Sequence, residues 1–493
     1  MRAFGAGRLQ VYVELTESSA ANLSVLNAVP DVQTEIVNSG LNLVQAWVPY
    51  AQIEAVARLP FVLRVRRPEY ARLHTGSITS EGDSILRADL VRTNLGITGL
   101  GVKVGVISDG ANDAASAQAT GDLPAAISLW GSCNPAFTGT TCNEGTAMME
   151  IVHDLAPGAE LGFGCVATSL DFIQRVADLK DWGAQVIVDD VGFYGEPYFE
   201  DGAVAGAYAA ALTQGIVMVT SAGNDATRHY QGMFTNNGSG VHLFSFGNPT
   251  MRIETFPGNV FVFLQWSSHW ESPSDRFQVC LTDLDGLVVY FCGDASPTHP
   301  ISVLGFTCLG PTHCVGHLRV HRVSGVPQTL EMFIFGPYLV EYQVPSDSIT
   351  GHAAVPGILA IGASHAFTPL DVATFSSQGP STVYFPTFQA RATPALTAVD
   401  AVEVTGVGGF GSPFYGTSAA APHVAGVAAL LLEAKPSLTP QEVASAMQNT
   451  ARDIVQFGNV NQGYDYVSGY GLVDAWGAVS NLNRRRRGQT VSE

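Results

Sequence analysis

Short apolar strands alternate with helical segments between residues 102 and 220, and this alternation constrains the fold of the chain more than any other feature. The expected strands cover 102–107, 159–166, 186–188 and 216–220, and the expected helices cover 170–182 and 203–212. Strands that alternate with helices build a parallel, doubly wound sheet. Because such sheets bind ligands at the carboxyl ends of their strands, the residues that follow each strand are the first candidates for a functional site.

A different pattern interrupts this alternation between residues 226 and 350. Turns rich in Gly, Pro and Asp separate short β-like segments, including 260–266, 277–281, 287–291 and 318–323. This pattern is typical of an all-β sandwich. We therefore predict an α/β fold with a doubly wound, mostly parallel sheet. Its domain covers 85–225 and 351–480, and the all-β sandwich is inserted at 226–350.

The two ends of the chain have patterns of their own. Strands are expected at 10–15, 43–48 and 61–65, with a helix at 50–59, so residues 1–75 are predicted to be a small α+β domain. Residues 481–493 are predicted to be a polar tail. The tail contains the basic run Arg484 to Arg487, which is typical of a solvated chain end or, less often, of a processing site.

Residues 416–426 read Gly-Thr-Ser-Ala-Ala-Ala-Pro-His-Val-Ala-Gly and begin an apolar helix that continues to Leu432. A serine at the start of a helix lies at the positive end of the helix dipole, where developing negative charge is stabilised. The segment resembles the catalytic-serine block of subtilisin-like serine proteases at every specified position. The resemblance implies that Ser418 is a nucleophile. The alternative is a Gly/Ala-rich helix that only packs in the core.

Other segments resemble further blocks of the subtilisin-like family, in the expected order. Asp109 ends the apolar stretch Val-Gly-Val-Ile-Ser-Asp-Gly and resembles the first acidic block. Asn224 follows the strand at 216–220, where its amide is placed to donate to an oxyanion beside the N–H of Ser418. The remaining matches are 351–363, 375–380 and 469–475. By the same resemblance, residues 1–75 look like a propeptide, the alternative being an unrelated α/β cap.

The position of the family's catalytic histidine holds a glutamate. The family block is His-Gly-Thr, then a helix and Ala-Pro-Gly-Ala, whereas this chain reads Glu-Gly-Thr from Glu144 and reaches Ala-Pro-Gly-Ala at 156–159. His153 lies about 13 Å further along the expected helix, so it does not easily replace the missing side chain. His423 lies inside the serine helix, where a histidine is more often a packing residue.

A carboxylate can also serve as the base, and sedolisin-type serine-carboxyl proteases, which share the fold, use Glu in this way. Their Glu is partnered by an Asp four residues later, and their oxyanion residue is an Asp. Here position 148 is Met and the oxyanion position is Asn224, so this resemblance is partial. We therefore expect Asp109 to be the partner of Glu144.

A glutamate base predicts activity at acid pH. Free Glu titrates near 4.3, about two units below His. A nearby Asp109 would raise one apparent pKa of the two carboxyls, whereas the helix N-terminus favours ionised Glu144. We expect activity at about pH 3–6.

Two neighbouring aspartates precede a candidate substrate-binding segment. Asp190, Val191 and Gly192 occupy the place of the family's extended substrate strand, which usually carries Ser-Leu-Gly. With Asp189, they make the cleft rich in carboxylates. These groups could favour basic substrate residues, join a proton-sharing network, bind a cation or stabilise a turn. We expect no cofactor, assign no metal ligands, and cannot assign a structural calcium ion to particular residues.

Six of the seven cysteines fall into three short-range pairs: Cys133/Cys142, Cys280/Cys292 and Cys308/Cys314. The middle pair brackets the turn Asp285-Gly286, and a bulge would bring the two cysteines into register. Cys165 is expected to be a buried free thiol. Three disulfides favour an oxidising compartment, so we expect an extracellular, periplasmic or cell-surface location, although residues 1–7 lack the apolar core of a signal peptide.

The net charge and the hydropathy of the chain limit the classes of partner that we expect. The net charge is −19, from 24 Lys+Arg and 43 Asp+Glu, which argues against nucleic acid or an anionic membrane as the main partner. The longest apolar run, 424–432, is shorter than the roughly 20 residues that span a bilayer. We expect a monomer that acts on proteins and peptides.

The leading hypothesis is a serine endopeptidase with Ser418 as nucleophile, Glu144 as general base and Asp109 as its partner. Asn224 would stabilise the oxyanion, and substrate would lie along Asp190 to Gly192. The alternative is a catalytically inactive peptide-binding or scaffold protein of the same fold, because the histidine is lost. A third hypothesis gives the main function to the inserted sandwich, for example carbohydrate or protein binding.

Overall fold

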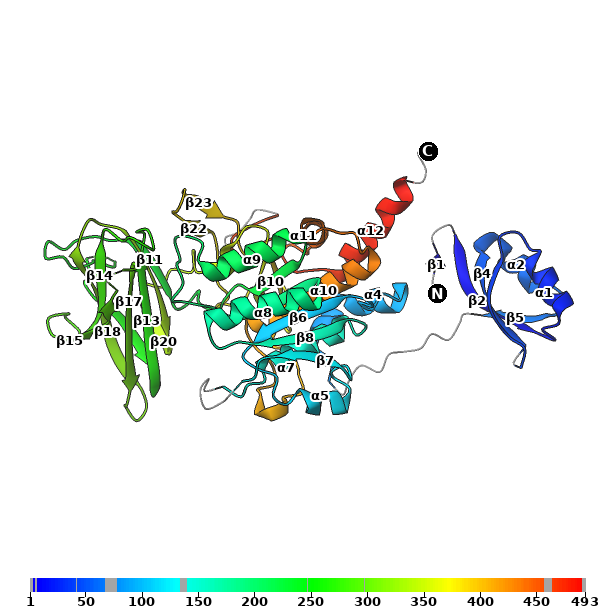
Figure 1. Cartoon of the computed structure of the whole chain (residues 1–493), viewed down its shortest axis with the longest axis horizontal. Helices are drawn as coiled ribbons and strands as arrows, with labels where there is room; N and C mark the ends of the chain where they lie inside the picture. Colours follow the sequence, from blue (N-terminus) through cyan, green and yellow to red (C-terminus); the bar gives the residue numbers. More distant parts are fainter. Residues whose placement is uncertain are drawn as a thin grey trace. The chain divides into compact units, whose positions relative to one another are not determined.

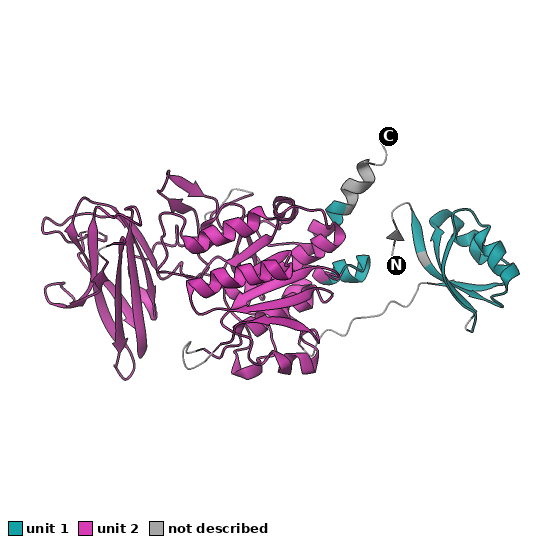
Figure 2. Ribbon diagram, in the orientation of Figure 1, with its two compact units in different colours: residues 1–74, 89–97, 480–493 teal, residues 75–88, 98–479 magenta. Residues whose placement is uncertain are grey.

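The computed structural model describes residues 3–4, 7–40, 42–66, 78–133, 140–245, 247–296, 298–455 and 463–489. They form two compact units (Figure 2). Unit 1 comprises residues 1–74, 89–97 and 480–493, and unit 2 comprises residues 75–88 and 98–479.

The N-terminal part of unit 1 is an antiparallel sheet with two helices. Its strands are β1 (Ala3–Phe4), β2 (Arg8–Leu15), β3 (Gln33–Asn38), β4 (Leu43–Pro49) and β5 (Val62–Arg66). The helices are α1 (Ala20–Asn27) and α2 (Ile53–Ala57), with a 3-10 turn at Tyr50–Gln52. The predicted α+β class is confirmed, but the prediction missed α1 and β3. The strand β3 leaves almost every side chain exposed, so its sequence lacks the alternating apolar pattern of a half-buried strand.

The central sheet of unit 2 has seven parallel strands in the order β24-β21-β10-β9-β6-β8-β7. Their bounds are β6 (Lys103–Ser108), β7 (Ile127–Trp130), β8 (Glu160–Cys165), β9 (Val186–Asp189), β10 (Val217–Ser221), β21 (Leu359–His365) and β24 (Leu396–Asp400). This arrangement confirms the predicted doubly wound, parallel sheet. Figure 1 shows it in the middle of unit 2, covered by helices.

Two pairs of helices pack against this sheet. One pair, α8 (Ser169–Trp182) and α9 (Ala203–Thr213), shares a buried core with Ile107, Ile187 and Met218 of the sheet. The other pair, α7 (Glu144–Leu155) and α10 (Thr417–Ala434), lies in mutual contact, and α10 runs along five of the strands. The smaller elements are α3 (Gly82–Ile85), α4 (Ala88–Leu95), α5 (Ala114–Thr120), α11 (Pro440–Gln448), α12 (Ala475–Gln489), β22 (Ser381–Val383), β23 (Gln389–Arg391), and 3-10 turns at Gly351–Ala354 and Val407–Gly409.

Two of these helices, α10 and α12, concern the predictions about a membrane span and a polar tail. By length and composition α10 could cross a membrane, but 89% of its apolar stretch is buried inside the unit, so it is a core helix. The helix α12 continues to Gln489, so part of the segment predicted as a polar tail is helical. The side chains of Arg484 to Arg487 and residues 490–493 lie outside the part of the chain that the structure describes.

Residues 229–340 form the predicted β-sandwich, which we call the inserted sandwich. One sheet has the order β11-β19-β13-β17-β16 and the other β15-β14-β18-β12-β20. The strands are β11 (His229–Met233), β12 (Met251–Thr255), β13 (Gly258–Trp266), β14 (Arg276–Thr282), β15 (Val289–Cys292), β16 (Asp294–Ala295), β17 (Ile301–Cys308), β18 (Cys314–Ser324), β19 (Thr329–Phe335) and β20 (Pro337–Val340). Trp266 and Phe277 are fully buried in the core between the sheets.

The three predicted disulfides are present, and Cys165 is a buried free cysteine. Cys280 and Cys292 are direct partners across β14 and β15, and the register shifts between Leu281 and Thr282. The expected bulge therefore brings this pair together.

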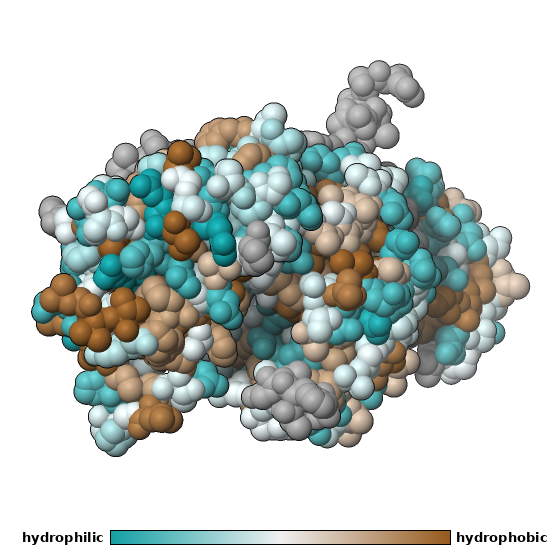
Figure 3. All heavy atoms as spheres, turned by 60° about the vertical axis from the view of Figure 1, so that its left-hand side comes forward, coloured by the Kyte–Doolittle hydropathy of each residue, from teal (hydrophilic) through white to brown (hydrophobic). Residues whose placement is uncertain are grey.

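The inserted sandwich also exposes large apolar side chains. Three of them, Leu284, Leu287 and Leu309, lie on turns and are 67%, 82% and 88% exposed. Figure 3, which turns this side of unit 2 forward, shows apolar patches within a largely polar surface.

Candidate active site

The carboxyl ends of three neighbouring strands supply side chains to one edge of the central sheet. Asp109 follows β6, Asp190 follows β9 and Asn224 lies shortly after β10. In the sheet, Asp189 is the partner of Ile107 on one side and of Thr220 on the other. Parallel neighbours end at the same edge, as expected for a ligand site of this fold.

Ser418 is the second residue of α10 and is 8% exposed. The chain enters this helix through Gly416, whose φ of 100° lies in a region that L side chains rarely adopt. The N–H of Gly416 donates to Oδ2 of Asp400 at 2.9 Å, which fixes the turn before the serine. Ser418 is thereby held at the positive end of a long buried helix.

Glu144 is the first residue of α7, and its carboxyl group interacts with the Ser418 hydroxyl. Burial raises the pKa of Glu144, and the charge of Asp109 raises it further, whereas hydrogen bonds from Asp190 and Ser418 lower it. The nucleophile and base of the sequence hypothesis are therefore in direct contact.

Asp109 contacts Glu144 through the backbone. Its Oδ1 accepts the N–H of Glu144 at 3.0 Å, so it caps the start of α7. The carboxyl group that hydrogen-bonds the Glu144 side chain is that of Asp190. From the sequence, Asp109 is expected in that place and Asp190 in the substrate-binding segment, with a proton-sharing network among the roles left open for Asp190.

Asp190 and the residues after it leave the sheet as an irregular segment. The strand β9 ends at Asp189, so Asp190, Val191 and Gly192 pair with no other strand of the described residues; that they bind substrate stays a prediction. Burial raises the pKa of Asp190 well above its ordinary value, and the charge of Glu144 adds to the effect.

Asp189 is held by hydrogen bonds inside the protein. Its fully buried carboxylate accepts hydrogen bonds from Tyr208 and from Thr220, the latter at 3.1 Å, and lies 3.0 Å from Nε2 of His352. The N–H of Val191 also donates to it at 3.0 Å. Of the roles open for the two aspartates, stabilising a turn therefore describes Asp189.

Asn224 is oriented by the residue before the serine. Its Oδ1 accepts the backbone N–H of Thr417 at 2.9 Å and the Thr417 hydroxyl at 3.0 Å. Because the amide oxygen is used in this way, the Nδ2 hydrogens are left to donate elsewhere. Nδ2 lies close to Gly416, where a Cβ would approach it to 3.1 Å. This arrangement presents an amide donor beside the start of α10.

The two histidines considered in the sequence are both buried. The Nδ1–H of His423 donates to the Ala419 carbonyl at 2.8 Å, so Nε2 accepts from the Ser80 hydroxyl, also at 2.8 Å. Burial lowers the pKa of His423 to about 4 and also lowers that of His153. Within the described residues, no histidine forms a hydrogen bond with Ser418, so His423 is the packing residue that the sequence indicated.

A pocket of about 160 Å³ lies beside Ser418. Its walls include Asp190 to Tyr194, Ala222 to Asp225, and Thr350 to Ala353. Phe335, from β19 of the inserted sandwich, also lines it. The Phe335 ring centroid is 4.5 Å from that of Tyr194.

Several of these pocket residues were missed in the sequence. Tyr194 donates to Asp225, and Arg228 lies 3.6 Å from the same carboxylate. Arg228 also lies 5.8 Å above the Phe335 ring. Their position in the sequence could have indicated them. Asp225 and Arg228 lie one and four residues after Asn224, at the point where the insertion begins.

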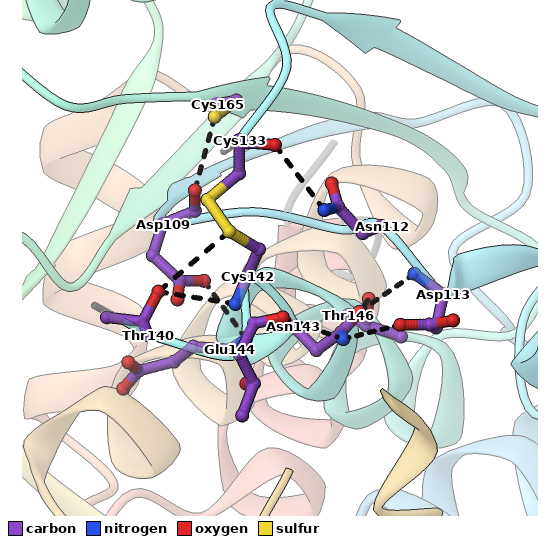
Figure 4. The surroundings of a disulfide bond; sticks show 11 residues. Asp109, Asn112, Asp113, Cys133, Thr140, Cys142, Asn143, Glu144, Thr146 and Cys165 are labelled. Atoms are coloured by element: carbon purple, nitrogen blue, oxygen red, sulfur yellow. Dashed lines mark hydrogen bonds between the residues drawn. A yellow bond between two sulfur atoms is a disulfide. The ribbon is translucent and has the colours of Figure 1, made fainter. Parts of the chain in front are cut away.

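A disulfide lies next to the start of α7. Figure 4 shows Cys133–Cys142 beside Asp109, with Glu144 two residues after Cys142. A Cβ on Gly110 would meet the Cys142 carbonyl oxygen at 2.6 Å and the Cys133 Cβ at 2.7 Å, so the two cysteines pack tightly on the residue after Asp109. Within the described ranges, no group of three or more His, Cys, Asp or Glu is arranged to hold a metal ion.

Comparisons with known proteins show similarities to subtilases and to a protease fold. Residues 340–471, which include Ser418, match the model of the Subtilase family. Fervidolysin of Fervidobacterium pennivorans is 46% identical over 66 residues, which are 13% of this chain and 9% of fervidolysin. The subtilisin-like protease SBT1.9 of Arabidopsis thaliana is 41% identical over 92 residues, 16% of this chain and 12% of that protein. The chain thus spans about a tenth of the length of these curated relatives.

Among solved structures, the CspB protease of Clostridium perfringens aligns with a TM-score of 0.56 at 16% sequence identity. The alignment covers 82% of this chain and 100% of that protein. The chain therefore has a subtilisin-like protease fold.

Proposed function

We propose that this chain is a serine endopeptidase in which Ser418 attacks the peptide carbonyl and Glu144 accepts the serine proton. The observation that carries the proposal is the interaction of the Ser418 hydroxyl with the Glu144 carboxyl group, which lowers the pKa of Glu144. A nucleophile in contact with a base, both at helix N-termini beside a pocket, is the arrangement that acyl transfer requires. The family match covers the nucleophile but not the base, so the role of Glu144 rests on this contact.

The proton follows one path in both halves of the reaction. As Oγ of Ser418 bonds to the carbonyl carbon, its proton moves to Glu144, and the oxyanion accepts hydrogen bonds from the Ser418 N–H and the Asn224 amide. Glu144 then gives the proton to the leaving amine, and the acyl-enzyme remains. In the second half, Glu144 takes a proton from water, water attacks the ester, and the proton returns to Ser418.

Asp109 supports the base without accepting the proton. It holds the backbone N–H of Glu144, which fixes the first turn of α7. Its charge also raises the pKa of Glu144 and so strengthens the base. Because Glu144 must be ionised to act, activity falls as the pH drops below its pKa. We propose an acid optimum, toward the upper part of about pH 3–6.

Incubation with a denatured protein substrate and a fluorophosphonate probe tests this function between pH 3 and pH 9. We expect cleavage and covalent labelling, and we expect Ser418→Ala to abolish both. A chain that is labelled at no pH but still binds peptides would be the inactive scaffold of the alternative hypothesis.

We further propose that residues 1–75 are a propeptide and that the enzyme acts outside the cytosol on proteins and peptides. The α+β fold of this segment and the three disulfides support these assignments. N-terminal sequencing of the purified, active protein tests the first. A mature protein that begins near residue 75 is expected, and an intact active chain would contradict it.

A further inference from the structure

We propose that Asp190 is a positioning residue that shares a single proton with Glu144, so that the base facing Ser418 is a pair of carboxyls with one negative charge. We call Glu144 and Asp190 the carboxyl pair. The inference rests on the proposed function, because it specifies how the Glu144 base is held ready. It assigns Asp190 a role in proton transfer in place of the substrate-binding role suggested by its sequence position.

The end of β9 places Asp190 in this role. Asp189 points to the face covered by α8 and α9, where it meets Tyr208 of α9. Asp190 is the first residue after β9, and its side chain interacts with Glu144 at the start of α7 and lines the same pocket as Ser418. The side chains of Asp190 and Glu144 are hydrogen-bonded.

The charges around the pair favour one shared proton. Two carboxylates in contact in a partly buried site repel each other strongly, and a hydrogen bond between them requires a proton. The other charged groups that act on the pair are also acidic: Asp109 at the end of β6 and Asp189 at the end of β9. Of the basic groups of the pocket, Arg228 is paired with Asp225 and His352 lies on Asp189.

No Lys or Arg of the described ranges forms an ion pair or hydrogen bond with either member, so a proton is what neutralises the second carboxyl. The directions of the pKa shifts agree. Burial is the main cause that raises the pKa of both Glu144 and Asp190, so the pair retains a proton. We place that proton on Asp190, because Glu144 must be ionised to accept from Ser418.

This arrangement keeps the charge of the pair low during catalysis. In the resting state, protonated Asp190 donates to one side of ionised Glu144, while the Ser418 hydroxyl donates to it as well. When Ser418 attacks, its proton passes to Glu144 and the pair becomes neutral. When Glu144 protonates the leaving amine, the pair returns to one negative charge. The Asp190 proton is not consumed.

The matched substitutions Asp190→Asn and Asp190→Ala test the pair. An asparagine amide still donates to Glu144 but cannot ionise, whereas alanine removes the donor. Kinetic constants for a peptide substrate and the rate of fluorophosphonate labelling are measured from pH 3 to pH 9. Glu160→Gln, at the exposed start of β8, is the control for loss of a carboxyl elsewhere.

For the unsubstituted protein we expect a bell-shaped profile whose alkaline limb reports loss of the shared proton. Asp190→Asn should keep kcat within about tenfold and lose that alkaline limb. Asp190→Ala should lower kcat by about 100-fold and move the acid limb to higher pH, since the hydrogen bond that lowers the pKa of Glu144 is gone. The proposal would be overturned if the pH profiles of both Asp190 variants kept the shape of the unsubstituted profile, with kcat lowered equally at every pH or with only KM changed.

A spectroscopic measurement keeps the test valid if an Asp190 variant folds poorly. Infrared difference spectra between the Ser418→Ala protein and the same protein with Glu144→Gln cancel the signals of the other buried carboxyls, such as Glu150 and Glu331. They should show a protonated carboxylic acid of the pair that persists to about pH 6, well above the ordinary range for Asp. Its absence would overturn the proposal. This test can fail while the proposed function holds. If labelling depends on Ser418 but no such proton is found, the chain is a serine peptidase without a carboxyl pair.

Discussion

At the scale of single residues, Asn224 and Glu144 are each held by hydrogen bonds to a nearby residue. Those bonds fix the direction in which the remaining polar atoms of the side chain point. Asn224 is the clearest case, because Thr417 occupies its amide oxygen and leaves the Nδ2 hydrogens for the oxyanion. Glu144 is similar, since Asp109 holds its backbone while its carboxylate faces Ser418. The groups are therefore oriented before substrate arrives, which is the source of electrostatic stabilisation in acyl transfer.

Replacing Asn224 by Ala tests this arrangement. Loss of one oxyanion donor should lower kcat by about 100- to 1,000-fold, or about 2.7–4 kcal/mol, with little change in KM. Steady-state kinetics on a peptide substrate measure the effect, and circular dichroism controls for folding. A variant that changes KM alone would place Asn224 in substrate binding instead.

The positions of Ser418, Glu144 and Asn224 could be predicted from the sequence, because each lies in a short motif next to a strand end or a helix start; their catalytic roles stay predictions. The partner of Glu144 could not be predicted. Which of Asp109 and Asp190 reaches its side chain depends on where β9 ends and on the direction in which each side chain points, and both are properties of the assembled sheet.

At the scale of elements, two features outside the family-like motifs lie at the site. Cys133 and Cys142 pack on Gly110, and Cys142 lies two residues before α7. The inserted sandwich supplies Phe335 to the pocket. Neither could be predicted as part of the site, because the first depends on packing of a loop and the second on how the insertion folds back onto residues 193–200.

Removing the first disulfide by Cys133→Ser with Cys142→Ser should loosen the start of α7. We expect a several-fold loss of kcat and about 2–3 kcal/mol less stability, the value for a closed loop of about ten residues. Activity and urea denaturation measure the two effects. The pair Cys308→Ser with Cys314→Ser, in the inserted sandwich, should leave kcat unchanged, and equal losses in both double variants would contradict a specific role.

Phe335→Ala tests the contribution of the insertion to the pocket. It removes a ring that contacts Tyr194 and supports Arg228, so KM for peptide substrates should rise several-fold while fluorophosphonate labelling persists. Phe261→Ala, which removes a 46% exposed ring from β13, is the matched control. Unchanged kinetics in Phe335→Ala would exclude the insertion from substrate recognition.

At the scale of the whole molecule, buried carboxyls favour stability at acid pH. Burial raises the pKa of Glu150 in α7 and of Glu331 in β19 to about 7 each. Both are protonated in the fold at pH values where the unfolded chain has already lost those protons. Stability is therefore fully retained below about pH 4.5 as far as these groups are concerned, and it falls as the pH rises through about 7.

We therefore expect the melting temperature to be higher at pH 5 than at pH 8. Each carboxyl should contribute up to about 3 kcal/mol to the difference in the free energy of unfolding. Calorimetry of the Ser418→Ala protein, which cannot digest itself, measures the effect. Glu150→Gln should reduce the pH dependence, whereas greater stability at pH 8 than at pH 5 would contradict the assignment.

The central claim, that Glu144 is the base for Ser418, is tested most directly by the pH dependence of fluorophosphonate labelling in Glu144 variants. We predict an acid optimum for the unsubstituted protein, a loss of about 100- to 10,000-fold in Glu144→Gln, and partial recovery in Glu144→His with an optimum shifted toward neutral pH. Undiminished labelling of Glu144→Gln, or an optimum of the unsubstituted protein at about pH 8 or above, would contradict it.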